Sequence, residues 1–229
     1  MLDAGQKPKW GWIELLIVYI GTVLLTLLGT TMVAETFVDT MSFFVVATIL
    51  QFCINIGLIF LIVIFINKAG LADLGLNKPS GHDLVMYGLF GGTLLMIGMI
   101  LLGIPLLYLQ PDVDPQPFEQ MLRSAGQNWQ FLVLLFLGVV TAPVAEELFF
   151  RGMLYPVFRA SLGPWWGAAA AGLIFGLAHW DLWRTIPLAI GGAVLCYMYE
   201  KTGNIWVTML AHGTWNGLMS LMVYFNFLV

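Results

Sequence analysis

Residues 130–152 read QFLVLLFLGVVTAPVAEELFFRG. The first fifteen of them, 130–144, carry no ionisable side chain, and two carboxylates and a guanidinium then follow within about one and a half helical turns. A helix needs roughly 20 mostly apolar residues to cross the hydrocarbon core of a bilayer. We therefore expect a membrane-spanning helix over 130–155 that carries Glu146, Glu147 and Arg151 inside it.

The composition of the whole chain is that of an integral membrane protein. Of its 229 residues, 60% are hydrophobic and 10% are charged, whereas soluble domains contain about 45–50% apolar and 25% charged residues. The apolar run at 12–34 is too long for a signal peptide, so we expect it to remain as the first span. The net charge of -4 is spread over loops without a basic run, so nucleic acid is not expected as a partner.

The same length rule can be applied along the whole chain. It predicts seven transmembrane helices, or eight if the glycine-rich stretch 84–109 is broken into two. We therefore expect an all-α polytopic membrane bundle that forms one domain over residues 1–229, with scaffold helices in 1–128 and polar, site-bearing helices in 129–229. The expected spans are 12–34, 41–66, 84–109, 130–155, 165–180, 183–199 and 205–228.

Charged residues between the spans predict the orientation. Most cations fall on one side of the expected membrane, and Arg123 and Arg184 are the exceptions. The positive-inside rule then places the N-terminus in the cytoplasm of a cell-membrane protein, and seven spans would place Val229 outside. The cations on the inner side are Lys7, Lys9, Lys68, Lys78, Arg159 and Lys201, and the acids on the outer side are Glu35, Asp39, Asp112, Asp114 and Glu119.

Six polar residues lie within the apolar spans of the second half. An ionisable group in a bilayer costs about 2.5–3.5 kcal/mol on insertion scales, so such groups pair with one another or line a wet cavity. We therefore expect a functional site formed from these helices. Its candidate residues are Glu146, Glu147, Arg151, His179, His212 and Asn216.

The spacing within 141–151 suggests different roles for the two glutamates. Pro143 is favoured in the first turn of a helix, so we expect the helix to break or restart there and to leave both carboxylates near a helical N-terminus. Glu147 and Arg151 are spaced i, i+4 with the acid first, the better order for an ion pair. Glu146 then has no partner and can act as a base on water. The alternative is a buried ion network of all three residues that only fixes helix packing.

The two embedded histidines lie on later helices. His179 follows Phe175 by four residues, and His212 precedes Asn216 by four, so each pair shares a helix face. His212 and Asn216 could donate hydrogen bonds to an oxyanion, or could simply join two helices. The helix of His179 carries small residues that allow close approach of its neighbours, at Gly163, Gly167, Gly172 and Gly176.

Three motifs on successive helices resemble one known family. EExxxR at 146–151, FxxxH at 175–179 and HxxxN at 212–216 are similar to those of the CAAX prenyl endopeptidase and bacteriocin-immunity superfamily, the CPBP or Abi family of intramembrane proteases. APxxEE at 142–147 and YxxTG at 199–203 look like family features too. The resemblance covers residue 141 to about residue 218.

The resemblance implies a site and an activity. It assigns Glu146 as the base that activates water together with His179, and His212 and Asn216 as the oxyanion site. Glu147 and Arg151 would shape the pocket. The implied substrates are membrane-tethered peptides, with prenylated ones the best-known class, and the lipid bilayer is the surrounding partner.

Other chemistries stay open at this point. Two carboxylates and two histidines could ligate zinc, with Glu146, His179 and His212 as the ligands. We favour a metal-free site without a cofactor, because HExxH and other short ligand spacings are absent from the sequence. A non-enzymatic immunity or scaffold protein could use the same motifs for packing. A proton-coupled transporter is a third reading, which the lack of an inverted repeat disfavours.

The expected spans raise one difficulty for a shared site. Counting about 1.5 Å per residue places Glu146 and His212 toward the cytoplasmic half, but places His179 near the opposite end of its span. A common site therefore requires that 156–182 is tilted, re-entrant or bounded differently from this expectation.

Overall fold

The computed structural model describes residues 7–37, 39–110 and 114–227, and within them the chain consists of helices and short connections. Asp112 and Val229, which entered the expected orientation, lie outside these residues. The helical elements are α1 (Trp12–Val33), η1 (Ala34–Thr36), α2 (Thr40–Phe60), η2 (Leu61–Ile66), η3 (Leu71–Leu74), α3 (Gly81–Asp83), η4 (Leu84–Phe90), α4 (Gly91–Leu109), α5 (Pro117–Ser124), α6 (Asn128–Phe136), η5 (Leu137–Thr141), α7 (Ala142–Glu147), η6 (Leu148–Leu154), α8 (Tyr155–Leu177), α9 (Leu182–Thr202) and α10 (Ile205–Tyr224).

Four helical stretches are long and apolar enough to cross a membrane, which agrees with the expected all-α membrane fold. In α1, the side chains of Leu16, Leu24 and Leu28 are 57–58% exposed on the outer face. A helix that is apolar all round and turns large side chains outward is suited to lipid rather than to water. The four stretches are Trp12–Thr36, Thr40–Ile66, Gly81–Leu106 and Asn128–Leu177.

The last stretch contains two antiparallel helices. The elements α6, η5, α7, η6 and the first part of α8 form one continuous helix over residues 128–162. It ends at Gly163, whose φ of 77° is a left-handed conformation that glycine adopts without steric cost. Beyond the turn, Gly167 lies so close to the first helix that a Cβ there would be 2.8 Å from the backbone nitrogen of Arg159. The expected helix end at residue 155 is therefore wrong by seven residues.

The expected break at Pro143 is also wrong, because the helix continues through it. The π-helical turn Leu137–Thr141 precedes Pro143, and the N–H of Ala142 donates to the carbonyl oxygen of Leu137. This widened turn accommodates a residue that has no N–H. Glu146 and Glu147 therefore lie in the middle of a long helix and not at a helical N-terminus.

The alternative in which 84–109 is broken into two helices does not occur. α3, η4 and α4 follow one another without a break from Gly81 to Leu109. Two glycines of this stretch, Gly88 and Gly92, allow close packing against α10, since a Cβ at Gly92 would lie 2.4 Å from the carbonyl oxygen of Ala211. Close packing of helices through small residues is typical of membrane bundles.

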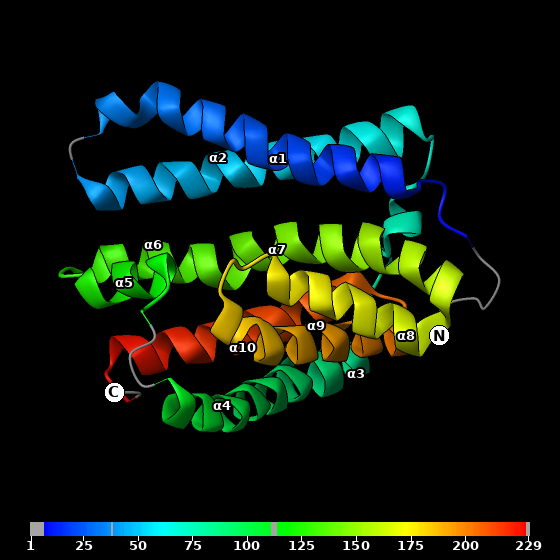
Figure 1. Ribbon diagram of the computed structural model, residues 1–229. Helices are drawn as coiled ribbons and strands as arrows, with labels where there is room; N and C mark the ends of the chain where they lie inside the picture. The colour runs from blue at the N-terminus through cyan, green and yellow to red at the C-terminus, as the bar shows by residue number, and fades with distance from the viewer. Residues whose placement is uncertain (1–6, 38, 111–113, 228–229) are drawn as a thin grey trace.

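The helices lie roughly side by side in a layered bundle (Figure 1). α1 and α2 form a pair along one side of the long helix, and α4 lies on the far side of α9 and α10. α10 contacts α4, α7 and α9 and thus occupies a central place. The N- and C-terminal segments lie at opposite ends of the bundle.

Candidate active site

The turn at Gly163 brings His179 level with Glu147. Glu147 lies 15 residues before Leu162, and His179 lies 15 residues after Pro164. At about 1.5 Å per residue, both lie about 22 Å from the turn. In the expected spans, His179 is separated from Glu146 because the helix ends at residue 155. The longer helix removes this separation.

Glu147 is the centre of a buried polar cluster. Its side chain is fully buried, and its Oε1 accepts hydrogen bonds from Arg151 Nη1 at 2.6 Å and from His212 Nδ1 at 2.8 Å. The ion pair expected from the i, i+4 spacing is therefore present. The bond to His212 joins α7 to α10 across 65 residues of sequence.

Arg151 contacts several neighbouring elements, although its Nε has no hydrogen-bond partner among the described residues. Its side chain is also fully buried, and Nη2 donates to the carbonyl oxygen of Gly192 on α9 at 2.9 Å. The guanidinium lies 4.8 Å from the centre of the Phe175 ring, a favourable position over the negative face of the ring. Gly192 can approach because it has no side chain, since a Cβ there would be 2.9 Å from the Cα of Gly172. Arg151 thus joins three helices around Glu147: the long helix, the part of α8 that follows Gly163, and α9.

The bond to Glu147 determines which nitrogen of His212 carries a hydrogen. An ionised carboxylate can only accept, so Nδ1 of His212 must donate. In the neutral ring, Nε2 then carries a lone pair and no hydrogen, so it cannot donate a hydrogen bond. The ring is 3% exposed and stacks on Trp215 with centroids 5.5 Å apart, which fixes its plane.

Glu146 faces the other nitrogen of His212. Its Oε2 lies 3.8 Å from Nε2, too far for a hydrogen bond. This oxygen is buried and has no hydrogen-bond partner among the described residues, although the side chain as a whole is 32% exposed. Glu146 is therefore the one carboxylate of the cluster that can be reached from outside it.

His179 joins the cluster through Phe175. Its Nδ1 lies 2.8 Å from the carbonyl oxygen of Phe175, which can only accept, so Nδ1 carries the hydrogen, and in the neutral ring Nε2 is an acceptor. The ring of Phe175 makes edge contacts with both histidines, at centroid distances of 4.8 Å to His179 and 5.7 Å to His212. Phe175 thus separates the two imidazoles, and no direct bond between His179 and Glu146 is present among the described residues.

Asn216 is positioned by a carbonyl that Pro143 leaves free. In a regular helix the N–H of residue 143 would bond to residue 139, and in a π turn to residue 138, but proline has none. Asn216 Nδ2 donates to the oxygen of Gly138 at 3.0 Å. The oxygen of Val139 lies against Gly213, where a Cβ would be only 2.5 Å away. Pro143 therefore seats α10 on the long helix beside the two glutamates.

The structure brings four of the six candidate residues into one cluster: Glu146, Glu147, Arg151 and His212. His179 is one aromatic ring away, and Asn216 lies one helical turn beyond His212. Among the described residues, no group of three or more His, Cys, Asp or Glu side chains is arranged to hold a metal ion.

A second polar network near the turn at Gly163 is not evident from the motifs. Glu200 on α9 accepts from Arg159 at 2.6 and 2.7 Å and from the hydroxyl of Tyr155 at 2.8 Å. The charge pattern predicts Arg159 between two spans, but it lies inside the long helix. The i, i+4 spacing of Tyr155 and Arg159 is a weak signal that could have indicated a shared face. The network holds α9 against the last turns of the long helix.

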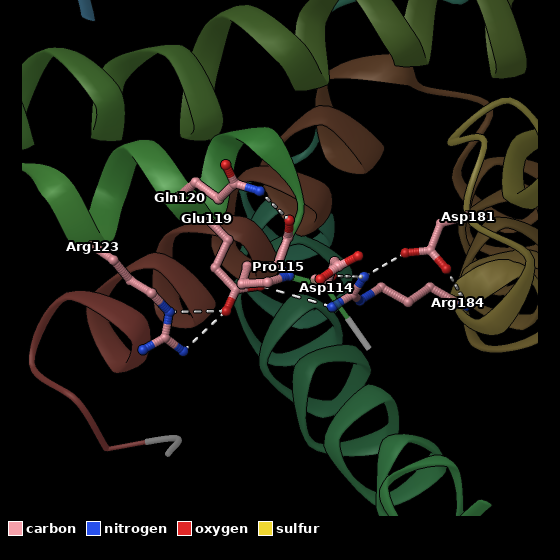
Figure 2. Close-up of polar contacts among 7 residues, drawn as sticks. All are labelled: Asp114, Pro115, Glu119, Gln120, Arg123, Asp181 and Arg184. Atoms are coloured by element: carbon pink, nitrogen blue, oxygen red, sulfur yellow. Dashed lines mark hydrogen bonds and ion pairs between the residues drawn. The ribbon is translucent and has the colours of Figure 1, made fainter. Parts of the chain in front are cut away.

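Figure 2 shows a third network, which links Arg184 and Asp181 to Asp114 and to α5. Arg184 on α9 bonds to the carboxylate of Asp181 and to the carbonyl oxygen of Asp114 at 3.0 Å, and lies 3.9 Å from Glu119 of α5. Burial alone would raise the pKa of Asp181, but hydrogen bonds from the backbone and side chain of Arg184 outweigh this and hold that pKa below its usual value. Arg123 donates to Glu119 at 2.9 and 3.1 Å. The two cations that departed from the expected charge pattern are thus paired with acids on their own side.

Comparison with known proteins supports the reading of the second half of the chain. Residues 128–218 match the family described as type II CAAX prenyl endopeptidase Rce1-like. This match confirms the resemblance drawn from the motifs, over the part of the chain that contains all six candidate residues.

Two relatives from Bacillus subtilis (strain 168) are similar to this chain. "Putative membrane peptidase YdiL" is 23% identical over 90 residues, which is 39% of this chain and 37% of that protein. "Uncharacterized protein YyaK" is 26% identical over 159 residues, which is 64% of this chain and 50% of that protein. The chain thus spans half or less of the length of these relatives, and no solved structure matches it. The family and the name of the first relative support a membrane peptidase.

Proposed function

We propose that this chain is an intramembrane endopeptidase that hydrolyses peptide bonds of membrane-tethered substrates with a water molecule activated by Glu146. The observation that carries the proposal is the unpaired Oε2 of Glu146, buried 3.8 Å from a histidine nitrogen on a side chain that is partly exposed. A buried carboxylate oxygen that accepts no hydrogen bond raises the free energy of a membrane protein and contributes nothing to packing. A role in chemistry accounts for it, and the family match supports the peptidase class.

Glu146 acts as the general base in this mechanism. It takes a proton from a water molecule while the water oxygen attacks the carbonyl carbon of the scissile peptide bond. The carbon–nitrogen bond then breaks, and the amine leaves with the proton that Glu146 had taken. His179 orients the water through its free Nε2, because its Nδ1 is committed to Phe175.

His212 stabilises the oxyanion through Nε2–H. With Nδ1 bonded to Glu147, Nε2 carries a hydrogen only when the ring is an imidazolium. In that state the two negative charges of Glu146 and Glu147 balance the two positive charges of Arg151 and His212, and a neutral cluster is favoured inside a membrane. The role of Glu147 is therefore to position His212 and to support its charge, in addition to shaping the pocket.

Asn216 supplies the second donor to the oxyanion. One hydrogen of its Nδ2 bonds to Gly138, and the other remains available to a substrate. Two donors aimed at the position of developing charge are typical of sites that carry out acyl transfer.

We propose that the reaction needs no metal ion. Oε1 of Glu147 already accepts from both Arg151 and His212, and a guanidinium beside the carboxylates disfavours a second cation there. Purified protein should contain less than stoichiometric zinc and should keep its activity in chelator. Stoichiometric zinc, with activity lost to chelator and restored by zinc, would overturn this part of the proposal.

We also propose the number of membrane spans and their orientation. Seven helices would cross the cell membrane, with the turn at Gly163 separating the fourth from the fifth, and the N-terminal end of the bundle would face the cytoplasm. The lysines near both ends of η3 support this orientation under the positive-inside rule. Reaction of single introduced cysteines with an impermeant reagent, at residues 68 and 127 in turn, would show which end faces inward.

The substrate class is tested with peptides in proteoliposomes. One peptide carries a prenylated C-terminal CAAX sequence, a second has the same sequence on a transmembrane anchor, and mass spectrometry locates the cut. Glu146→Ala and His179→Ala should each abolish cleavage without lowering the unfolding temperature, while Glu35→Ala, at an exposed carboxylate, should keep it. Full cleavage by either site variant would remove that residue from the mechanism.

The second candidate is a non-enzymatic immunity or scaffold protein, and the complete burial of Glu147 and Arg151 favours it. In that case Glu146→Ala would have no biochemical effect beyond stability. Cleavage of neither peptide by the wild-type protein, with an intact bundle, would favour this reading over the peptidase.

A further inference from the structure

A cavity of about 410 Å³ lies at the N-terminal end of the bundle, apart from the candidate active site. None of the six candidate site residues lines it. Its volume is within the range of sites that take small ligands, which is about 300–1,000 Å³. The polar side chains that line it include Lys7, Asp73, Lys78, Arg159, Thr202 and Asn204.

The charges of this lining favour an anion. Asp73 is its one carboxylate, and Lys9 already bonds to it at 2.9 Å. Arg159 is paired with Glu200. Lys7 and Lys78 are both exposed and have no ion-pair partner among the described residues, so the cavity has two uncompensated positive charges in a chain whose net charge is -4.

Hydrogen bonds and close packing hold part of the cavity wall in place. The amide of Asn204 donates to the carbonyl oxygen of Asn77 at 2.8 Å, and the backbone N–H of Ile205 donates to Gly75 at 3.0 Å. Tyr199 packs on Gly75 so closely that a Cβ there would be 2.4 Å from the hydroxyl. A site that is held in place loses little conformational entropy on binding.

The position of the cavity is that of a membrane surface. Its lining comes from the segment before α1, from the connection between η2 and α3, and from the turn between α9 and α10, where the apolar helices end. Basic pockets at this level in membrane proteins bind phosphate headgroups. We propose that this cavity binds a phosphate-bearing anion, with the headgroup of an anionic phospholipid as the source that its position favours and soluble phosphate as the other.

The test uses the purified full chain in detergent and soluble short-chain lipids. Dioctanoyl phosphatidylglycerol should bind more tightly than dioctanoyl phosphatidylcholine, as measured by native mass spectrometry. Lys7→Gln and Lys78→Gln should each weaken this binding about fivefold, the effect of one lysine near an anionic surface. Lys68→Gln, at an exposed lysine outside the cavity lining, is the matched control and should leave binding unchanged.

A parallel titration with inorganic phosphate separates the two sources. Phosphate binding with the same dependence on Lys7 and Lys78, without lipid selectivity, would assign the site to a soluble ligand. Two results would overturn the proposal: no binding of either anion, or a loss in Lys68→Gln as large as in the two cavity variants, which would indicate only a diffuse positive field.

Discussion

Replacing Arg151 with Met would leave Glu147 as a fully buried carboxylate without its guanidinium. The two side chains have no exposed area and are 2.6 Å apart, and the change also removes the bond to Gly192. Breaking a buried pair on one side costs about 3–5 kcal/mol, because a charge remains uncompensated. At roughly 2–4 °C per kcal/mol for a chain of this size, the unfolding temperature should fall by roughly 6–20 °C.

A double-mutant cycle isolates the charge pair from lost packing. Glu147→Gln removes the orphaned charge, so the double variant Glu147→Gln/Arg151→Met should be more stable than Arg151→Met alone, with a coupling energy of about 2 kcal/mol or more. Arg123→Met is a matched control, because Arg123 also follows its glutamate by four residues but is 38% exposed. That change should cost less than about 1 kcal/mol.

The assay is thermal or denaturant unfolding of each variant in one detergent, followed by circular dichroism. The reasoning is refuted if Arg151→Met is no less stable than Arg123→Met. It is equally refuted if the double variant is as unstable as Arg151→Met, since the loss would then come from packing and not from the uncompensated charge.

Three further changes test separate parts of the structure. Gly213→Ala should destabilise the bundle by about 1–3 kcal/mol through overpacking, whereas Gly98→Ala, which meets nothing within 4 Å, should be neutral or stabilising in unfolding measurements. Asn216→Ala should lower kcat by about 10²–10³-fold with little change in KM, if its amide stabilises the oxyanion, and an unchanged kcat would contradict that role. The hydrogen bond from Lys9, together with that from the backbone N–H of Gly70, lowers the pKa of Asp73 below its usual value of 3.8. The ion pair therefore stabilises the folded chain above pH 3.8. This contribution to stability is lost as the pH falls through the lowered pKa. Lys9→Met should therefore be less stable than wild type by under about 1 kcal/mol at pH 7, and the difference should shrink on acidification.

The all-helical membrane fold was predictable because apolar runs of bilayer length fill the sequence, whereas the number of spans stays a prediction. The glycine-rich stretch 84–109 and Pro143 misled the prediction for a common reason. Glycine and proline interrupt helices in water, but here neighbouring helices and a π turn supply the missing contacts. Gly92, within 84–109, and Pro143 are both places where α10 packs closely against its neighbours.

The clustering of four candidate residues could be expected from their polarity inside apolar spans, but the bonds that join them could not. The i, i+4 spacing indicated the ion pair between Glu147 and Arg151, because both residues lie on one face of the same helix. The bond between Glu147 and His212 crosses 65 residues, and no local pattern encodes it. It depends on the turn at Gly163 and on the close approach of α10, which are properties of the assembled bundle.

The central claim is that Glu146 is the base that activates water. The most direct measurement is kcat of Glu146→Gln, a change that keeps the shape of the side chain and removes its basicity. We predict a fall of about 10²–10⁴-fold with an unfolding temperature equal to or above that of the wild type. A kcat within a few-fold of the wild-type value would contradict the account, since the unpaired carboxylate would then have no part in the reaction.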